Sequence, residues 1–230
     1  MYSITTIITA AGIGSRGGFK TPKTLLTANN RTLLDRLLND SLGVTYILTN
    51  GNNYKEFISY EDKVKIWSNK VKGMIIPGCL ENVSNFIKNK RIKTDLLILT
   101  GSIIYNFDLS SVLRRFQHMK EIVLPIRLKS NSNSSGKLRI SEEGKIISFV
   151  GGLYDSKSFN YEELGIYFIP KKRLNLLHDC VKKYKKDSIR YLIEYLFNKV
   201  PVYGIEVSGD WNHIVTIEDY NEIKNKKEYI

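Results

Sequence analysis

The sequence has few cysteines, no long apolar run and fewer acidic than basic side chains. Its 230 residues include two cysteines, Cys79 and Cys180, which lie in unrelated segments and form no CxxC pair. This excludes a disulfide scaffold or a zinc knuckle and is typical of the reducing cytoplasm, where we expect this protein. No apolar run approaches the ~20 residues that a membrane-spanning helix needs, so we expect no membrane span.

The sequence also lacks the pattern of a signal peptide, an internal repeat and an interdomain linker, which narrows the class of protein it can be. The segment Met1–Ile8 has neither a basic stretch nor an A-x-A cleavage site, so we expect no signal peptide. There is no internal repeat and no interdomain linker, and the 42% hydrophobic share excludes a disordered chain. We therefore expect one domain over residues 1–230. The 23 acidic residues stand against 35 Lys and Arg, and this formal charge of +12 indicates an anionic partner without identifying it.

Short apolar segments alternate with amphipathic ones through the first half of the chain. This alternation predicts an α/β fold, with a single Rossmann-like mixed, mostly parallel sheet flanked by helices. Glycine turns at the carboxyl ends of such strands are where these sheets bind ligands. The main segments are predicted strands at 2–9, 44–49, 71–76, 95–100, 122–128, 164–169 and 202–207, a hairpin at 138–150, and helices at 32–38, 80–90, 109–119, 171–183, 188–197 and 217–227.

The most informative segment is the glycine-rich loop at residues 10–23, AAGIGSRGGFKTPK, which follows the first predicted strand. Backbone amides from Gly12 to Ser15 can surround phosphate oxygens, and Arg16 and Lys23 can neutralise their charge. The loop therefore predicts a phosphate-binding site.

Two other interpretations of this loop compete. Gly12, Gly14 and Gly17 satisfy GxGxxG, but Pro22 interrupts the helix that should follow in a dinucleotide-binding site. The second strand also ends in Thr49-Asn50 rather than in an acidic ribose ligand. A Walker A loop is excluded because no Gly-Lys-Ser/Thr follows. A structural glycine turn with unrelated basic residues remains an alternative.

The loop resembles the signature of the sugar-phosphate nucleotidyltransferases, LAAGxGxR followed by PKxLL. The resemblance extends to residues 96–113, 164–169 and 211–220, the last reading WNHIVTIEDY. It therefore spans the chain and implies the nucleotide-diphospho-sugar transferase fold. The matching signature positions are Ala10, Ala11, Gly12, Gly14, Arg16, Pro22, Lys23, Leu25 and Leu26.

The resemblance implies that an NTP binds in the loop and that a phosphorylated acceptor attacks its α-phosphorus, releasing pyrophosphate. The acceptor would be a sugar 1-phosphate or a small phospho-alcohol. Arg16 and Lys23 would then be the catalytic cations, because charge neutralisation matters more to this chemistry than a protein base. The implied nucleotide-binding residues are Ala10, Ala11, Gly12, Gly14, Ser15 and Gly101.

The chain departs from the family where the resemblance implies Mg²⁺. Two family Asp positions carry Ser102 and His213, and neither a hydroxyl nor an imidazole replaces a carboxylate well as a magnesium ligand. Asp210 and His213 together form one candidate for a rebuilt metal site, and a structural, hydrogen-bonded His213 is the alternative. Gly151-Gly152 also stands where family members often carry Glu-Lys, whose lysine grips the acceptor phosphate.

These departures leave two hypotheses: a diverged, active nucleotidyltransferase, or a catalytically degenerate relative that binds nucleotide as a regulatory or partner subunit. We do not expect a nucleic-acid partner, because the basic runs at 171–173 and 182–186 read as solvated helix faces. The sequence leaves open the base of the NTP, the acceptor and the oligomeric state.

Overall fold

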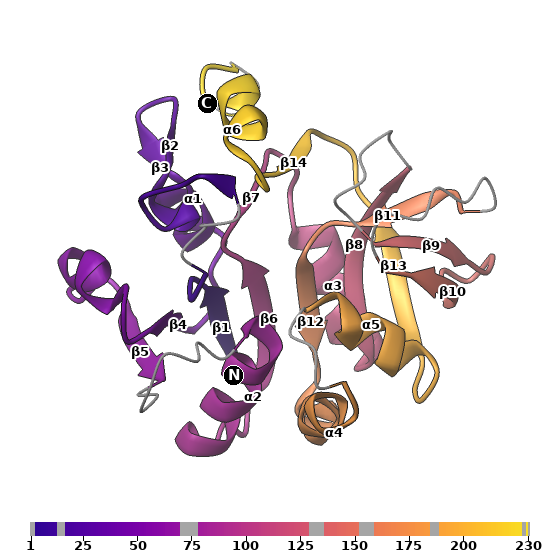
Figure 1. The fold of residues 1–230 in the computed structure, drawn as a ribbon. Helices are drawn as coiled ribbons and strands as arrows, with labels where there is room; N and C mark the ends of the chain where they lie inside the picture. The colour runs from indigo at the N-terminus through magenta and orange to yellow at the C-terminus, as the bar shows by residue number, and fades with distance from the viewer. Residues whose placement is uncertain are drawn as a thin grey trace.

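The computed structural model describes residues 3–12, 17–69, 78–128, 136–151, 159–184, 189–226 and 229 (Figure 1). Gly14, Ser15, Arg16, Gly152 and the strand predicted at 71–76 lie outside these residues. None of the helices in the described part is long and apolar enough to cross a membrane.

Within the described residues, one mixed sheet of ten strands organises the fold, in the order β10-β9-β11-β8-β12-β6-β1-β4-β5 with β13 paired to β8. Strands β5, β4, β1, β6, β8 and β13 run in one direction, and β12 is antiparallel to both β6 and β8. The strands of the sheet are β1 (Ile4–Thr9), β4 (Val44–Asn50), β5 (Lys65–Asn69), β6 (Asp95–Thr100), β8 (Ile122–Leu128), β9 (Lys137–Ile140), β10 (Ile146–Val150), β11 (Tyr161–Glu163), β12 (Ile166–Ile169) and β13 (Val202–Glu206).

Helices cover both faces of this sheet. On one face, α2 (Cys79–Lys90), α4 (Asn175–Lys183) and α5 (Arg190–Phe197) pack over a core that includes Ile7, Phe86 and Ile98. On the other face, α1 (Leu33–Asn39), α3 (Ser110–Met119) and the 3-10 helix η3 (Tyr54–Tyr60) cover residues such as Ile8 and Leu97. Alternate residues of one strand enter opposite cores, as the two-residue period of a buried strand requires.

Segments from both ends of the chain meet at the carboxyl edge of the sheet. The short strand β14 (Trp211–His213) pairs antiparallel with β7 (Ile103–Tyr105), and the hairpin of β2 (Thr27–Ala28) and β3 (Arg31–Thr32) lies beside α6 (Ile217–Ile223) in Figure 1. Phe19, Ile104, Ile214 and Ile223 share a third core there. The 3-10 turns η2 (Lys23–Leu25) and η4 (Lys171–Arg173) complete the elements.

The predicted fold class is confirmed, and the differences have local causes. Thr32 caps α1 by accepting a hydrogen bond from the backbone N–H of Asp35, as its position predicts. The predicted strand at 164–169 begins only at Ile166, as β12, because Gly165 adopts a φ of +74° and separates it from β11, which the sequence did not predict. Strands β7 and β14 were missed, since three residues are too few to show a period.

Candidate functional site

The start of the glycine loop is held by two buried asparagines at the end of β4. The Asn53 side-chain amide donates to the Ala10 carbonyl at 2.8 Å, and the Asn50 amide donates to the Ala11 carbonyl. Ala10 and Ala11 are buried, whereas the next residue, Gly12, is exposed and has open space where a Cβ would stand. The turn therefore leaves the sheet at a defined point with its first glycine facing solvent.

Gly101 lets the ends of β1 and β6 approach each other. Its backbone N–H donates to the Thr9 carbonyl at 3.1 Å, and a Cβ built on it would lie 2.1 Å from that oxygen and 2.5 Å from Thr24 Oγ1. No larger side chain fits without a backbone shift. Gly101 is thus required by close packing, and its predicted contact with nucleotide stays a prediction.

Lys23 is fixed at this edge by the segment that follows β14. Its Nζ donates to the carbonyl oxygens of Ile214 at 2.9 Å and Val215 at 3.1 Å, and lies 5.7 Å from the centre of the Phe19 ring. These contacts orient a half-buried ammonium group with residues far along the chain. Gly14, Ser15 and Arg16 lie outside the described residues, so the partnership of Arg16 with Lys23 stays a prediction.

Ser102 and His213, at the two positions where the family resemblance implies Asp, are brought together. His213 Nε2 lies 3.0 Å from Ser102 Oγ, and both side chains are only partly buried. The Ile214 backbone N–H donates to the Ser102 carbonyl at 2.8 Å, and the Ile214 carbonyl accepts from Lys23. One residue, Ile214, therefore connects the Ser102–His213 pair to the predicted catalytic lysine.

Asp210 does not join this pair. Its carboxylate accepts from the Asn106 side chain at 3.1 Å, and its backbone N–H donates to the Asn106 side-chain oxygen at 2.6 Å. Asn106 lies beyond Tyr105, which pairs with Trp211, whereas His213 pairs with Ile103 at the other end of the β14–β7 ladder. Asp210 and His213 are three positions apart along extended backbone, a span of about 10 Å. The structure thus does not assemble the metal site proposed for Asp210 and His213.

The donor set at the edge does not fit Mg²⁺. This ion prefers several hard oxygen ligands, usually including carboxylates, at about 2.1 Å. The Ser102–His213 pair offers a hydroxyl and an imidazole that already bond to each other. Across the described ranges there is no group of three or more His, Cys, Asp or Glu side chains that could hold a metal ion.

Two buried polar atoms near the strand ends have no hydrogen-bond partner among the described residues. Asn82, in the first turns of α2, donates to the Thr49 carbonyl at 3.2 Å, but its side-chain oxygen has no partner among the described residues. The same holds for Thr100 Oγ1 at the end of β6. A buried polar atom without a partner is costly unless a ligand or water satisfies it. Neither residue was predicted from the sequence, although their places at the ends of predicted elements offered a signal.

A buried ionic cluster lies on the other side of β14. Glu162 accepts from Arg127 Nε at 2.7 Å and from Lys137 Nζ at 2.8 Å, and the Glu162 side chain has no exposed surface. Arg127 also donates to the Trp211 carbonyl at 3.1 Å. Its guanidinium carbon lies over the Trp211 indole ring, 4.9 Å from the ring centre. Trp211 therefore places this cluster beside the strand that carries His213.

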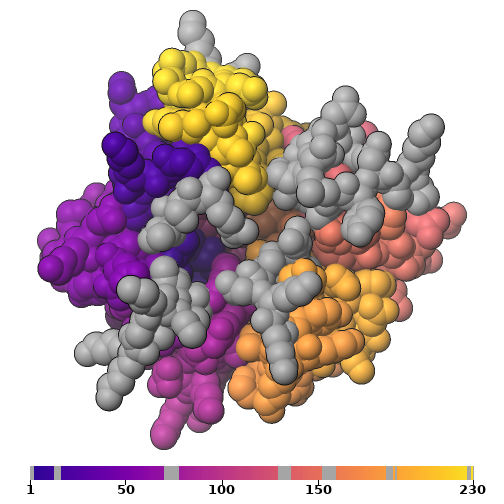
Figure 2. Space-filling model, in the orientation of Figure 1, coloured from indigo at the N-terminus to yellow at the C-terminus, as the bar shows by residue number. Residues whose placement is uncertain are grey.

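A hollow marks this face of the molecule. Figure 2 shows it at the centre, between the N-terminal half, coloured indigo to magenta, and the C-terminal half, coloured orange to yellow. In the same orientation, Figure 1 shows β1 and β6 ending behind it. The ends of β1 and β6 thus lie at a concave surface.

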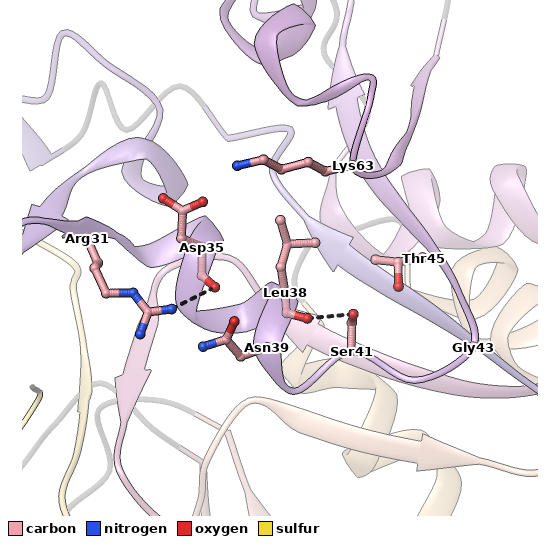
Figure 3. A pocket seen from close by; sticks show the side chains of 8 residues that line it. All are labelled: Arg31, Asp35, Leu38, Asn39, Ser41, Gly43, Thr45 and Lys63. Atoms are coloured by element: carbon pink, nitrogen blue, oxygen red, sulfur yellow. Dashed lines mark hydrogen bonds between the residues drawn. The ribbon is translucent and has the colours of Figure 1, made fainter.

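A separate cavity lies at the opposite edge of the sheet. It has a volume of about 480 Å³, and Figure 3 shows Arg31, Asp35, Asn39 and Lys63 among its lining residues. Thr45, at the amino end of β4, also lines it, whereas Asn50 at the carboxyl end contacts the glycine loop. This cavity is therefore not part of the candidate site.

The fold is that of an α/β protein in which Gly12, Gly101 and Lys23 lie near the carboxyl ends of parallel strands. The sequence profile described as "Nucleotidyl transferase" matches residues 15–229, and the chain belongs to this family. No curated protein sequence matches the chain significantly.

Solved structures share the fold at low sequence identity. A UDP-glucose pyrophosphorylase complexed with UDP-glucose has a TM-score of 0.74 at 17% identity, covering 97% of both chains. A UTP-bound UGPase from Acinetobacter baumannii has a TM-score of 0.73 at 15% identity, covering 97% of this chain and 92% of that one. A Bacillus anthracis protein assigned as a glucose-1-phosphate thymidylyltransferase, in complex with a sucrose, has a TM-score of 0.73 at 19% identity over 99% of both chains.

Proposed function

We propose that this chain transfers a nucleoside monophosphate from an NTP to a phosphorylated acceptor and releases pyrophosphate. The observation that carries the proposal is the anchoring of Lys23 by Ile214 and Val215 at the edge where the glycine loop begins. Family membership and the UTP and UDP-glucose held by structurally similar proteins support the same reaction.

The reaction requires negative charge to be neutralised as it develops. An acceptor phosphate oxygen forms a bond to the α-phosphorus, the bond from that phosphorus to the bridging oxygen breaks, and pyrophosphate leaves with the electron pair. Lys23 would stabilise the charge on the phosphates, and because it is already oriented it needs little reorganisation. The backbone around Gly12 would hold the triphosphate, and the acceptor would be a sugar 1-phosphate or a small phospho-alcohol.

A second function is favoured by one observation, the replacement of carboxylates by Ser102 and His213. A chain that had lost turnover but retained nucleotide binding would act as a regulatory or partner subunit. Both functions place the nucleotide at the same edge of the sheet, so turnover separates them.

The test is pyrophosphate release from ATP, CTP, GTP, UTP or dTTP, each with glucose 1-phosphate or phosphocholine. We expect turnover with at least one pair, and a loss of about 10²–10³ in kcat/KM for Lys23→Ala. Lys88→Ala is the matched control, because Lys88 is an exposed lysine in the last turn of α2, outside the loop, and should leave turnover unchanged. Nucleotide binding without pyrophosphate release from any pair would favour the partner-subunit function instead.

A further inference from the structure

Half of the surplus positive charge of the chain lies in three short segments, 90–93, 118–121 and 171–173. They read KRIK, HMKE and KKR, and they hold seven Lys or Arg side chains against one Glu. Their formal charge is therefore +6, out of +12 for the whole chain. The proposed reaction uses none of these residues.

Strand pairing brings the three segments together at the amino edge of the sheet. Helices α2 and α3 end at Lys90 and Met119, shortly before β6 and β8 begin, and the antiparallel strand β12 ends shortly before η4. In the sheet, β12 lies between β6 and β8, with Ile169 beside Leu96. The segment 171–173 therefore lies between the other two, and Figure 1 shows α2 and α4 at this end of the molecule.

Two contacts hold the segments to one another. The backbone N–H of Lys171 donates to the carboxylate of Asp95, the first residue of β6, at 2.6 Å. Glu121, just before β8, accepts from Lys172 at 2.5 Å and from Arg173 at 3.1 Å. The only carboxylate of the three segments is thus shared between two of their cations. Together the segments form one surface, which we call the basic edge.

The cations of the basic edge are exposed. Arg91, Lys93, Lys171 and Lys172 all face solvent, and the first three form no ion pair within the described residues. The dipole of an α-helix favours cations at its last turn, but Lys93 lies in a loop and Lys171 in a 3-10 turn. Like charges gathered on one surface repel one another, and an anionic partner would relieve this repulsion.

The composition of the basic edge favours a lipid surface over a nucleic acid. Single strands stack on aromatic side chains, and none of these eleven residues is Phe, Tyr or Trp. A DNA major groove takes the length of a helix or a β-ribbon, whereas the basic edge consists of helix ends, loops and a 3-10 turn. Clustered Lys and Arg side chains are attracted to anionic lipid headgroups without needing either feature.

We infer that the basic edge binds anionic phospholipid headgroups, so that the chain attaches to a membrane surface by electrostatic attraction. No helix in the described ranges could cross a membrane, which suits a reversible attachment. Strand β6 has six residues and is about 20 Å long, and Gly101 follows its other end. A chain held by the basic edge therefore keeps the candidate nucleotide site facing away from the lipid. The inference does not depend on the proposed reaction.

Co-sedimentation with lipid vesicles tests the inference. One set contains phosphatidylcholine alone, and the other contains roughly a third phosphatidylglycerol. We expect the full chain to partition onto the anionic vesicles at least about tenfold more strongly, and to be released when the salt rises from about 0.1 M to about 1 M. Equal partitioning onto both sets, or none onto either, overturns the inference.

Charge reversal locates the binding surface. Lys93→Glu combined with Lys171→Glu should lower partitioning onto the anionic vesicles by about tenfold or more. Lys55→Glu combined with Lys145→Glu is the matched control, because both lysines are exposed on other parts of the molecule and the net charge changes equally. The control should bind within about threefold of the unmodified protein. An equal loss in both double variants would show that net charge, rather than the basic edge, drives binding.

Two further measurements complete the test. Lys93→Gln combined with Lys171→Gln adds no carboxylate, so it should fold normally by circular dichroism and bind with intermediate strength. Normal vesicle binding by this folded variant would overturn the inference. A short RNA or DNA duplex in excess should leave the protein on anionic vesicles. Displacement by either, through an interaction that Lys93→Glu with Lys171→Glu abolishes, would assign the basic edge to nucleic acid instead.

Discussion

The two sides of β14 use different polar chemistry. On the side of β1, β4 and β6, asparagine amides, threonine hydroxyls and backbone groups shape the edge, and two buried atoms, Asn82 Oδ1 and Thr100 Oγ1, have no partner in the described part of the chain. On the side of β8, β9 and β11, the carboxylate of Glu162 is paired with two cations. The first side therefore has polar atoms left unpaired among the described residues, whereas on the second the carboxylate of Glu162 is paired with two cations.

This difference between the two sides predicts that substitutions on the side of β8, β9 and β11 reduce the free energy of unfolding, whereas substitutions on the side of β1, β4 and β6 also weaken nucleotide binding. A buried carboxylate between two cations supports the fold, and its loss leaves buried charge behind. A glycine at a crowded strand end supports the shape of the binding edge. The following substitutions test this division, beginning with the largest expected effect.

The ionic cluster should dominate stability. Glu162→Gln removes both ion pairs while Lys137 remains buried, so we expect the free energy of unfolding to fall by about 3 kcal/mol in urea denaturation. Glu121→Gln is the matched control, because Glu121 pairs with Lys172 and Arg173 at the surface and should cost less than about 1 kcal/mol. Equal losses for the two variants would remove the distinction between the two regions.

The crowded strand end should combine a smaller stability cost with a binding defect. Gly101→Ala places a Cβ against Thr9 O and Thr24 Oγ1, so we expect a loss of about 2 kcal/mol and weaker NTP binding. Urea denaturation and calorimetry measure the two effects. Gly51→Ala, where a Cβ would meet nothing within 4 Å, should change neither. Normal nucleotide affinity in a folded Gly101→Ala variant would argue against the edge as the binding surface.

The carboxyl group of Glu163, next to Glu162 in β11, should make a smaller contribution to the free energy of unfolding, and one that depends on pH. Burial raises the pKa of Glu163 above its ordinary value of 4.5, although Gly165 N–H and Tyr167 O–H donate to it. At pH values between the unfolded and folded pKa of Glu163, the native state binds a proton that the unfolded state has lost. The stabilisation that comes from this proton is therefore fully present below pH 4.5 and declines as the pH rises through the folded pKa.

Glu163→Gln should remove that decline. We expect the unfolding free energy of the variant, measured by urea denaturation from pH 4 to 8, to vary less steeply than that of the unmodified protein. The difference in slope is at most about 1.4 kcal/mol per pH unit, the limit for one proton. An unchanged slope would show that the carboxyl group of Glu163 titrates normally.

The sequence predicted the first region better than the second. Short apolar runs bounded by glycine located β1, β4 and β6, and the periodic pattern located α2. The ionic cluster was not predicted, because Arg127, Lys137 and Glu162 come from three separate strands and share no local spacing. Burial of a charge becomes visible only when the strands are paired.

The candidate site was predicted in part for the same reason. The motif identified Lys23, but its anchoring to Ile214 and Val215 depends on contacts across nearly the whole chain. The family resemblance identified Ser102 and His213 separately. Only the pairing of β14 with β7 shows that their side chains are in contact. Asp210 could not be separated from them by sequence, since its partner Asn106 lies 104 positions away.

The anchoring of Lys23 has a consequence for protein synthesis. The lysine is made well before its hydrogen-bond partners, which follow 191 and 192 residues later. The parallel strands β1, β4 and β6 can pair in a nascent chain well before then, leaving the lysine without its anchor. A ribosome-bound chain that stops short of β14 would therefore hold Lys23 without its anchor, and this edge would mature only after Ile214 and Val215 have been made.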